Sequence, residues 1–216
     1  MTKYKIIFYT VWLALISLGI FTVFVNTPFS GILQNKAALA NVIQRTLGLT
    51  AFTMMFTQII LGSYMSKWIE KYGPWIFKFH VFEGILAYII IFLHPVFFML
   101  FNYFAGRGFD PFFTFIDVCV LCSTKTDFYY TLGRVGFWLV TIGVFAGLFR
   151  TATPFMRMHW RKFHILNYIA FLIVGLHGFF LGTDFTVMPF VLFAAVAYIA
   201  VLATVVIKSA SLLKKA

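Results

Sequence analysis

Six long apolar runs constrain most tightly how this chain can fold. They cover approximately residues 5–25, 42–64, 76–103, 132–150, 163–182 and 186–207. A helix needs about 20 apolar residues to cross the roughly 30 Å hydrocarbon core of a bilayer, and each run comes close to this length or exceeds it. The sequence therefore predicts an all-α integral membrane protein, a bundle of six helices that forms a single domain over residues 1–216.

The composition agrees with this prediction. Hydrophobic residues make up 62% of the chain and charged residues only 11%, which is too few to cover a soluble domain. The formal net charge is +11, but the basic residues cluster at the ends of the apolar runs. Membrane topology and anionic lipid explain such clusters, and no nucleic-acid motif is present. The first run is long for a signal peptide and no small-x-small cleavage site follows it, so we expect a retained span.

The distribution of Lys and Arg predicts the orientation. With six spans, both termini and the second and fourth loops share one side, and that side holds twelve of the 17 basic residues. The positive-inside rule places this side in the cytoplasm and the long loop 104–131 outside, in a plasma or bacterial inner membrane. The twelve residues are Lys3, Lys5, Lys67, Lys71, Lys78, Arg150, Arg157, Arg161, Lys162, Lys208, Lys214 and Lys215.

Four of the five histidines form two pairs at matched depth. His80 and His94 are about 14 residues apart in the third run, which corresponds to about 21 Å of helical rise and stops about 40° short of four turns. His164 and His177 in the fifth run are closer in sequence by a single position. If the third and fifth helices pack side by side, the inner pair and the outer pair each face across a gap.

Two facing imidazoles suit the two axial positions of a haem iron, because each neutral ring offers one nitrogen lone pair. Two stacked haems between the third and fifth helices would carry electrons across the bilayer, a distance that one haem cannot span efficiently. The alternatives are histidines that are hydrogen-bonded between helices, and a haem-free transporter or scaffold that uses the histidines and Glu83 as a proton or metal path. Ionisable residues inside membranes are costly and by default indicate function, so we expect two haems.

The shorter histidine spacing in the fifth run predicts an irregular helix. From His164 to His177 a regular helix turns about 1300°, which leaves the two side chains about 140° out of phase. We expect a π-bulge or kink between Asn167 and Gly175, unless the two porphyrins meet this helix at different azimuths. His159 precedes His164 and lies too far from His177 to match the depth of the pair on the third helix, so we expect it at the membrane interface.

The histidine pattern, H-x13-H followed by H-x12-H, resembles the ferric reductase-like transmembrane domain. This family includes NADPH oxidases, ferric-chelate reductases and the membrane haem subunit of the bacterial methionine sulfoxide reductase system. The segments GRVGFW at 133–138 and WRKFHILNY at 160–168 are also similar to it, and the resemblance extends over runs two to six. It implies haem b at both sites, with His80 and His164 holding the inner haem and His94 and His177 the outer one. It also implies electrons moving outward from the cytoplasm, as in an oxidoreductase membrane subunit.

The chain departs from the oxidases in one respect. Those proteins carry a flavin- and nicotinamide-binding module after the last helix, and no Gly-rich dinucleotide loop follows Ile207 here. We therefore expect the electrons to come from a separate flavin reductase or from a membrane quinol. The acceptor stays open among ferric chelates, oxygen and a periplasmic redox protein, and the ascorbate-dependent cytochromes b are a neighbouring alternative.

Three arginines are candidates for haem propionates, because the guanidinium group pairs with carboxylates in a bidentate manner. Arg45 and Arg134 lie on the outer side, and an arginine placed like Arg45 lies near the oxygen-reducing site of the oxidases, which makes Arg45 a catalytic candidate. Arg161 flanks the inner site. The alternatives are snorkelling to the interface for Arg45 and Arg134, and positive-inside topology for Arg161.

Two further features lie close to these sites. Cys119 and Cys122 form the sequence CVLC in the outer loop, where a disulfide that braces the loop is the simplest interpretation. Glu83 is the only acid well inside a run, one helical turn from His80, and could orient a ligand, pair with a basic residue or relay a proton.

Overall fold

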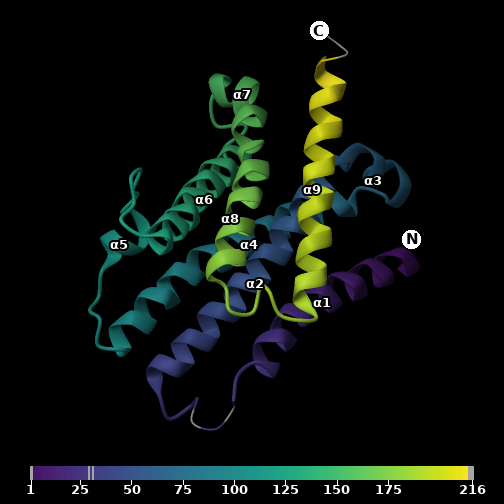
Figure 1. Cartoon of the computed structure of the whole chain (residues 1–216). Helices are drawn as coiled ribbons and strands as arrows, with labels where there is room; N and C mark the ends of the chain where they lie inside the picture. Colours follow the sequence, from purple (N-terminus) through teal and green to yellow (C-terminus); the bar gives the residue numbers. More distant parts are fainter. Residues whose placement is uncertain (1, 29, 31, 214–216) are drawn as a thin grey trace.

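The computed structural model describes residues 2–28, 30 and 32–213 of the chain. Of these residues, 81% are helical and none lies in a strand. Figure 1 shows the helices of the described part, which are α1 (Thr2–Val25), α2 (Lys36–Ser63), α3 (Met65–Tyr72), α4 (Trp75–Phe104), α5 (Pro111–Phe115), α6 (Lys125–Leu148), α7 (Pro154–His164), α8 (Leu166–Leu181) and α9 (Phe190–Leu213).

Within the described part of the chain, six helical segments are long and apolar enough to cross a membrane, as the sequence predicted. Helices α1, α2, α4, α6 and α9 are five of them, and α7 together with α8 is the sixth. Two helices begin earlier than their apolar runs, because Asn35 caps α2 and Thr124 caps α6. Each side chain accepts backbone N–H groups of the first turn, and so the helix starts in polar sequence. The bundle is compatible with a multi-pass membrane protein.

The surface of α9 is apolar on the side that faces away from the bundle. Leu192, Val196, Ile199 and Val206 are between 59% and 65% exposed and recur at helical spacing. Ala197 and the opposite side of the helix are buried. Contiguous apolar surface of this kind is rare on soluble proteins and is what contact with lipid requires.

Four helices enclose the centre of the bundle. Helix α2 packs along α4, helix α6 packs along α8, and α4 contacts α6 across the centre. Helix α1 covers α2, and α9 lies against α8 and α2 (Figure 1). A cluster of aromatic rings joins three of these helices, because Phe52 stacks on Phe171 with centroids 4.6 Å apart and meets Phe190 edge-on at 6.2 Å.

The fifth span is broken at Ile165, between the end of α7 and the start of α8. The N–H of Tyr168 donates to the Ile165 carbonyl at 3.1 Å, which is the tight spacing of a 3₁₀ turn. Such a turn rotates about 120° per residue instead of about 100°, in the direction that the phase deficit of the histidines requires. The predicted position was wrong, since residues 167–175 form regular α-helix. The rotation between His164 and His177 is a sum over all the residues between them, so it does not show at which residue the extra rotation occurs.

The predicted outer loop 104–131 is partly helical. It contains α5, which Asp110 caps by accepting the N–H of Phe113 at 2.9 Å, and the first turns of α6. The predicted disulfide between Cys119 and Cys122 is present in the segment that joins these two helices.

Candidate functional site

Two cavities lie one above the other inside the bundle, and each contains one histidine pair. The cavity of about 340 Å³ is lined by His80 and His164, and the cavity of about 570 Å³ is lined by His94 and His177. We call them the inner and the outer cavity. Both volumes fall in the range of about 300–1,000 Å³ that is typical of ligand and cofactor pockets.

A single layer of apolar side chains separates the cavities. Met55 from α2, Ile91 from α4 and Val140 from α6 line both of them. Side chains from three helices therefore form a common wall, and groups bound in the two cavities would contact opposite sides of it.

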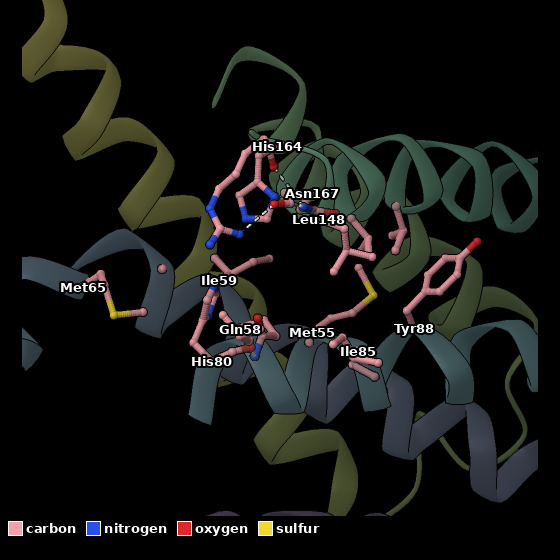
Figure 2. A pocket seen from close by; sticks show the side chains of 18 of the residues that line it. Met55, Gln58, Ile59, Met65, His80, Ile85, Tyr88, Leu148, His164 and Asn167 are labelled. Carbon is pink, nitrogen blue, oxygen red and sulfur yellow. Dashed lines mark hydrogen bonds between the residues drawn. The ribbon is translucent and has the colours of Figure 1, made fainter. Parts of the chain in front are cut away.

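The two rings of each pair lie at nearly the same separation, with their planes at 76° in the inner pair and 90° in the outer pair. The ring centroids of His80 and His164 are 6.4 Å apart, and those of His94 and His177 are 6.5 Å apart. Figure 2 shows His80 and His164 on opposite sides of the inner cavity. Two metal–imidazole bonds of about 2 Å in line, with about 1.2 Å from each nitrogen to its ring centre, need a separation of roughly 6.4 Å. The centroid separation of each pair thus matches the separation that one metal atom between two imidazoles requires.

Three of the four histidines are anchored through Nδ1 by a backbone carbonyl. Nδ1 lies 2.8 Å from the Gln44 carbonyl in His94, 2.8 Å from the Gly143 carbonyl in His164 and 2.9 Å from the Tyr129 carbonyl in His177. A carbonyl only accepts, so each Nδ1 carries the proton and donates it. In the neutral ring this leaves the Nε2 lone pair for a metal, an arrangement that also orients the ring and raises its basicity as a ligand.

His80 differs from the other three. Its Nδ1 is buried and has no hydrogen-bond partner within the described residues. The side-chain amide of Gln58 donates to the backbone carbonyl of His80 at 2.9 Å and not to this ring nitrogen.

Each histidine ring packs against a glycine on the neighbouring helix. Gly48 and Gly62 on α2 have the same sequence separation as His80 and His94 on α4. The two glycines of α6 that contact histidines, Gly133 and Gly147, have this separation as well. Each carbonyl that anchors an Nδ1 belongs to the residue four positions before such a glycine, so the glycine opens the space in which the ring reaches that carbonyl. The contacts are Gly48 with His94, Gly62 with His80, Gly133 with His177 and Gly147 with His164.

Glu83 lies beside the inner cavity without a basic partner in the described part of the chain. It is 1% exposed, and its carboxylate accepts hydrogen bonds from the Gln58 amide and, at 3.4 Å, from Nε1 of Trp12. The Gln58 amide thus connects the carboxylate to the backbone of His80. The sequence left three roles open for Glu83, and the structure does not show one of them, the pairing with a basic residue.

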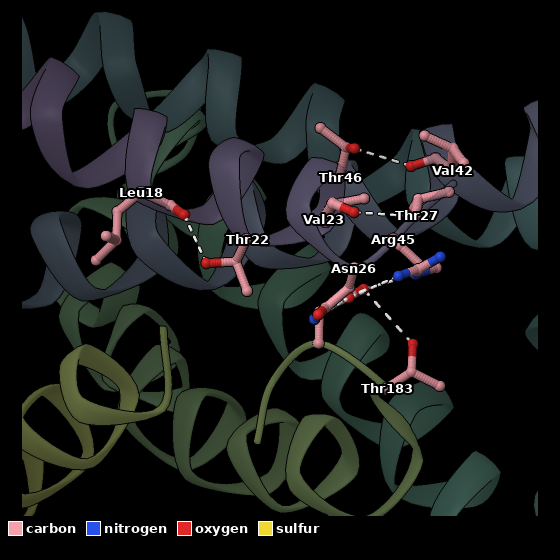
Figure 3. Close-up of polar contacts among 10 residues, drawn as sticks. Leu18, Thr22, Val23, Asn26, Thr27, Val42, Arg45, Thr46 and Thr183 are labelled. Carbon is pink, nitrogen blue, oxygen red and sulfur yellow. Dashed lines mark hydrogen bonds and ion pairs between the residues drawn. The ribbon is translucent and has the colours of Figure 1, made fainter. Parts of the chain in front are cut away.

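Arg45 lines the outer cavity and forms an ion pair with Asp184. Its Nε and Nη2 donate to the two carboxylate oxygens at 2.6 Å each, and Asn26 donates to the same carboxylate at 3.2 Å. Figure 3 shows the side chains of Arg45 and Asn26 converging at this point. The carboxylate is 2% exposed, so the ion pair ties the loop before α9 to α2, and the Asn26 contact ties it to the segment directly after α1.

The other two predicted arginines have different surroundings. Arg134 lines the outer cavity, is 6% exposed, donates to the Asp117 carbonyl and lies 4.4 Å above the Phe113 ring. Arg161 is exposed and lies above the Trp160 ring at 5.5 Å. Among the described residues, the arginine that lines the inner cavity is Arg150, which donates to the Gly147 carbonyl at 3.0 Å.

Within the described residues no group of three or more His, Cys, Asp and Glu side chains is placed to hold a metal ion. Each histidine pair offers two imidazole rings, one from α4 and one from the span formed by α7 and α8. This suits a metal whose remaining donors come with the bound group.

No protein-family model matches this chain, and no curated protein and no solved structure shows significant similarity to it.

Proposed function

We propose that this protein is a membrane cytochrome that binds two b-type haems and carries electrons across the bilayer. The observation that carries the proposal is the separation of the histidine rings, 6.4 Å in the inner cavity and 6.5 Å in the outer one. Both values match two imidazoles on opposite sides of one iron atom. A porphyrin brings its own four equatorial nitrogens, so a pair of histidines completes the coordination.

The residues of both cavities fit haem. The inner haem would be held by His80 and His164, and the outer haem by His94 and His177. Bound haem supplies one-electron redox chemistry at its iron. The glycines beside the rings leave space for imidazoles fixed between helices, and the apolar wall of Met55, Ile91 and Val140 keeps water from the space between the cavities.

In this proposal the main function of the four histidines is to coordinate the haem iron. Because Nδ1 of His94, His164 and His177 donates to a carbonyl, each ring is fixed in the tautomer that coordinates through Nε2. If both histidines of a pair bound the iron, the protein would leave no open position there, which would favour electron transfer over oxygen binding.

The direction and the partners rest on the charge pattern and on the resemblance to the ferric reductase-like family. Both termini would face the cytoplasm of a cell with this protein in its plasma or inner membrane. A flavoprotein or a quinol would deliver electrons at the inner haem. A ferric chelate, oxygen or a periplasmic redox protein would receive them at the outer haem. Arg134 lines the outer cavity and Arg150 the inner one, where either could pair with a propionate.

A visible spectrum of the purified protein tests the proposal. The reduced-minus-oxidised difference should show b-type Soret and α bands, and the haem content should approach two per chain. If these bands are absent after haem supplementation, the proposal fails. The buried Glu83 and the histidines would then favour the haem-free proton or metal path.

A further inference from the structure

The disulfide between α5 and α6 is placed where a soluble protein can reach it. Cys119 and Cys122 enclose only Val120 and Leu121, which is the C-x-x-C spacing of thiol–disulfide oxidoreductases. Both cysteines are half-buried, whereas Val120 is 90% exposed and Leu121 is 95% exposed. The half-buried disulfide therefore lies beside two apolar side chains that are almost fully exposed.

This disulfide is a weak structural brace. Closing so short a loop restricts the unfolded chain less than closing a long loop does. The segment also has other anchors, because Trp138 donates to the Phe115 carbonyl at 2.8 Å and Arg134 donates to the Asp117 carbonyl. The segment is thus held to α6 independently of the disulfide, and a loop brace does not account for the cysteines.

A short chain of contacts joins the disulfide to His177. The Tyr129 carbonyl accepts the Nδ1–H of His177 at 2.9 Å. Slightly further along α6, the hydroxyl oxygen of Thr131 lies 3.2 Å from Sγ of Cys119 and also accepts the Cys119 N–H at 3.2 Å. Two non-covalent contacts and a short stretch of α6 backbone therefore connect an outer-cavity histidine to a sulfur atom.

The wall of the outer cavity continues into the same segment. Thr114 and Phe115, which precede the cysteines, line the cavity, and so do Tyr130 and Arg134, which follow them. The disulfide thus lies just behind this wall. Electron transfer slows steeply with distance, so a reducible group in this position competes well with any acceptor that must diffuse to the cavity.

We propose that the Cys119–Cys122 disulfide is a redox-active group that takes electrons from the outer cavity and passes them to disulfides of soluble proteins. This inference rests on the proposed function, whose flavin or quinol donor supplies the electrons. Two electrons, delivered one at a time, and two protons from water break the S–S bond and yield two thiols.

The second step regenerates the disulfide. One thiolate of the pair attacks a disulfide of the soluble protein and displaces one of its sulfurs as a thiol, which forms a mixed disulfide. The other cysteine then attacks the mixed disulfide, restores the Cys119–Cys122 bond and releases the soluble protein as a dithiol. The exposed Val120 and Leu121 provide the apolar contact at which that protein docks.

Thiol tagging measures the first step directly, because the chain contains two cysteines and both belong to this pair. The haem-loaded full chain in nanodiscs is reduced without oxygen by photoreduced flavin mononucleotide and quenched in acid. Free thiols are then tagged with a maleimide-linked polyethylene glycol, and the visible spectrum is recorded in the same sample. We expect two tags per chain, appearing as the haem bands return to the oxidised form after the light is turned off.

Three variants separate the path from direct reduction by the flavin. The double variant His94→Ala with His177→Ala should gain no tags in the same time. Thr131→Val, which keeps the side-chain shape but removes the hydroxyl, should slow tagging several-fold at unchanged haem content, whereas Thr131→Ser should keep the wild-type rate. Equal tagging in wild type and the double variant would show that the cavity is not the source of electrons and would overturn the inference.

A second measurement uses the protein without haem. In a buffer of reduced glutathione, a redox-active pair should become tagged in at least half of the chains, whereas a structural disulfide resists reduction by glutathione. Reduced haem beside an intact disulfide overturns this inference and leaves the proposed function standing. Absence of the haem bands removes both, and the spectrum distinguishes that outcome from the first.

Discussion

Gly133 and His177 are packed so closely that a methyl group on the glycine would lie 2.7 Å from the imidazole Cε1. The same holds on the other side of the outer cavity, where a Cβ on Gly48 would lie 2.9 Å from Cε1 of His94. Real Cβ atoms do not approach other carbons this closely, so both rings depend on the missing side chains. The outer pair is therefore seated between two glycines.

Substitution of these glycines should displace the outer pair selectively. Gly48→Ala or Gly133→Ala should lower the haem content by about one haem per chain, because the ring must move and overpacking costs about 1–3 kcal/mol. Gly62→Ala is the matched control on α2, since its Cβ would lie 3.4 Å from the His80 ring, an ordinary contact. Haem content by the pyridine haemochrome assay measures the difference. Equal haem loss in Gly62→Ala and Gly48→Ala would contradict the predicted asymmetry.

Removing one ligand from either cavity should remove the haem of that cavity. His94→Ala and His177→Ala should each lose about half of the haem, because one imidazole does not complete the coordination of the iron. His159→Ala is the control, since this half-buried ring stacks on Phe155, with centroids 4.5 Å apart, and lines neither cavity. Unchanged haem content in both His94→Ala and His177→Ala would show that the pairing is incorrect.

The bidentate ion pair between Arg45 and Asp184, at the mouth of the outer cavity, should stabilise the folded protein. Asp184→Asn should lower the thermal midpoint in detergent, because it leaves the Arg45 guanidinium without its bidentate partner, and breaking a buried pair costs up to about 3–5 kcal/mol. A double-mutant cycle with Arg45→Gln should return a coupling energy of about 0.5–3 kcal/mol. Additive effects of the two substitutions would show that the contact contributes nothing to stability.

Glu83 should tolerate glutamine better than alanine. Glu83→Ala leaves the buried donors of Gln58 and Trp12 unsatisfied, which costs about 1–3 kcal/mol, whereas Glu83→Gln keeps one acceptor oxygen and so preserves one of the two hydrogen bonds. Thermal unfolding followed by circular dichroism compares the two variants. If Glu83→Gln is as unstable as Glu83→Ala, the negative charge itself contributes, and the carboxylate has a role beyond accepting these bonds.

The histidine pairs could be predicted from the sequence because helical rise depends only on sequence separation. That arithmetic placed His80 opposite His164 and His94 opposite His177, as the structure has them. The rotation was harder to use. A deficit in phase indicated either an irregular turn or two groups bound at different azimuths, and the tightened turn at Ile165 lies outside the stretch from which an irregularity was expected.

Long-range polar contacts were beyond sequence reasoning. Arg45 and Asp184 lie on segments far apart in the chain, and no local pattern relates them. The glycines are a different case, because Gly48 and Gly62, like Gly133 and Gly147, repeat the sequence spacing of the two histidines on α4. Comparing this spacing between helices would have identified α2 and α6 as the helices that support the rings.

The apolar wall of Met55, Ile91 and Val140 also makes the two cavities sensitive to each other's charge, because apolar side chains screen an electric field poorly. At a separation of about 21 Å along α4 and an effective dielectric constant of about 20, a unit charge in one cavity raises the energy of a like charge in the other by about 0.8 kcal/mol. In the proposed cytochrome this corresponds to about 35 mV between the first and the second reduction. The conduit would then carry single electrons in succession, with each departure making the next arrival easier.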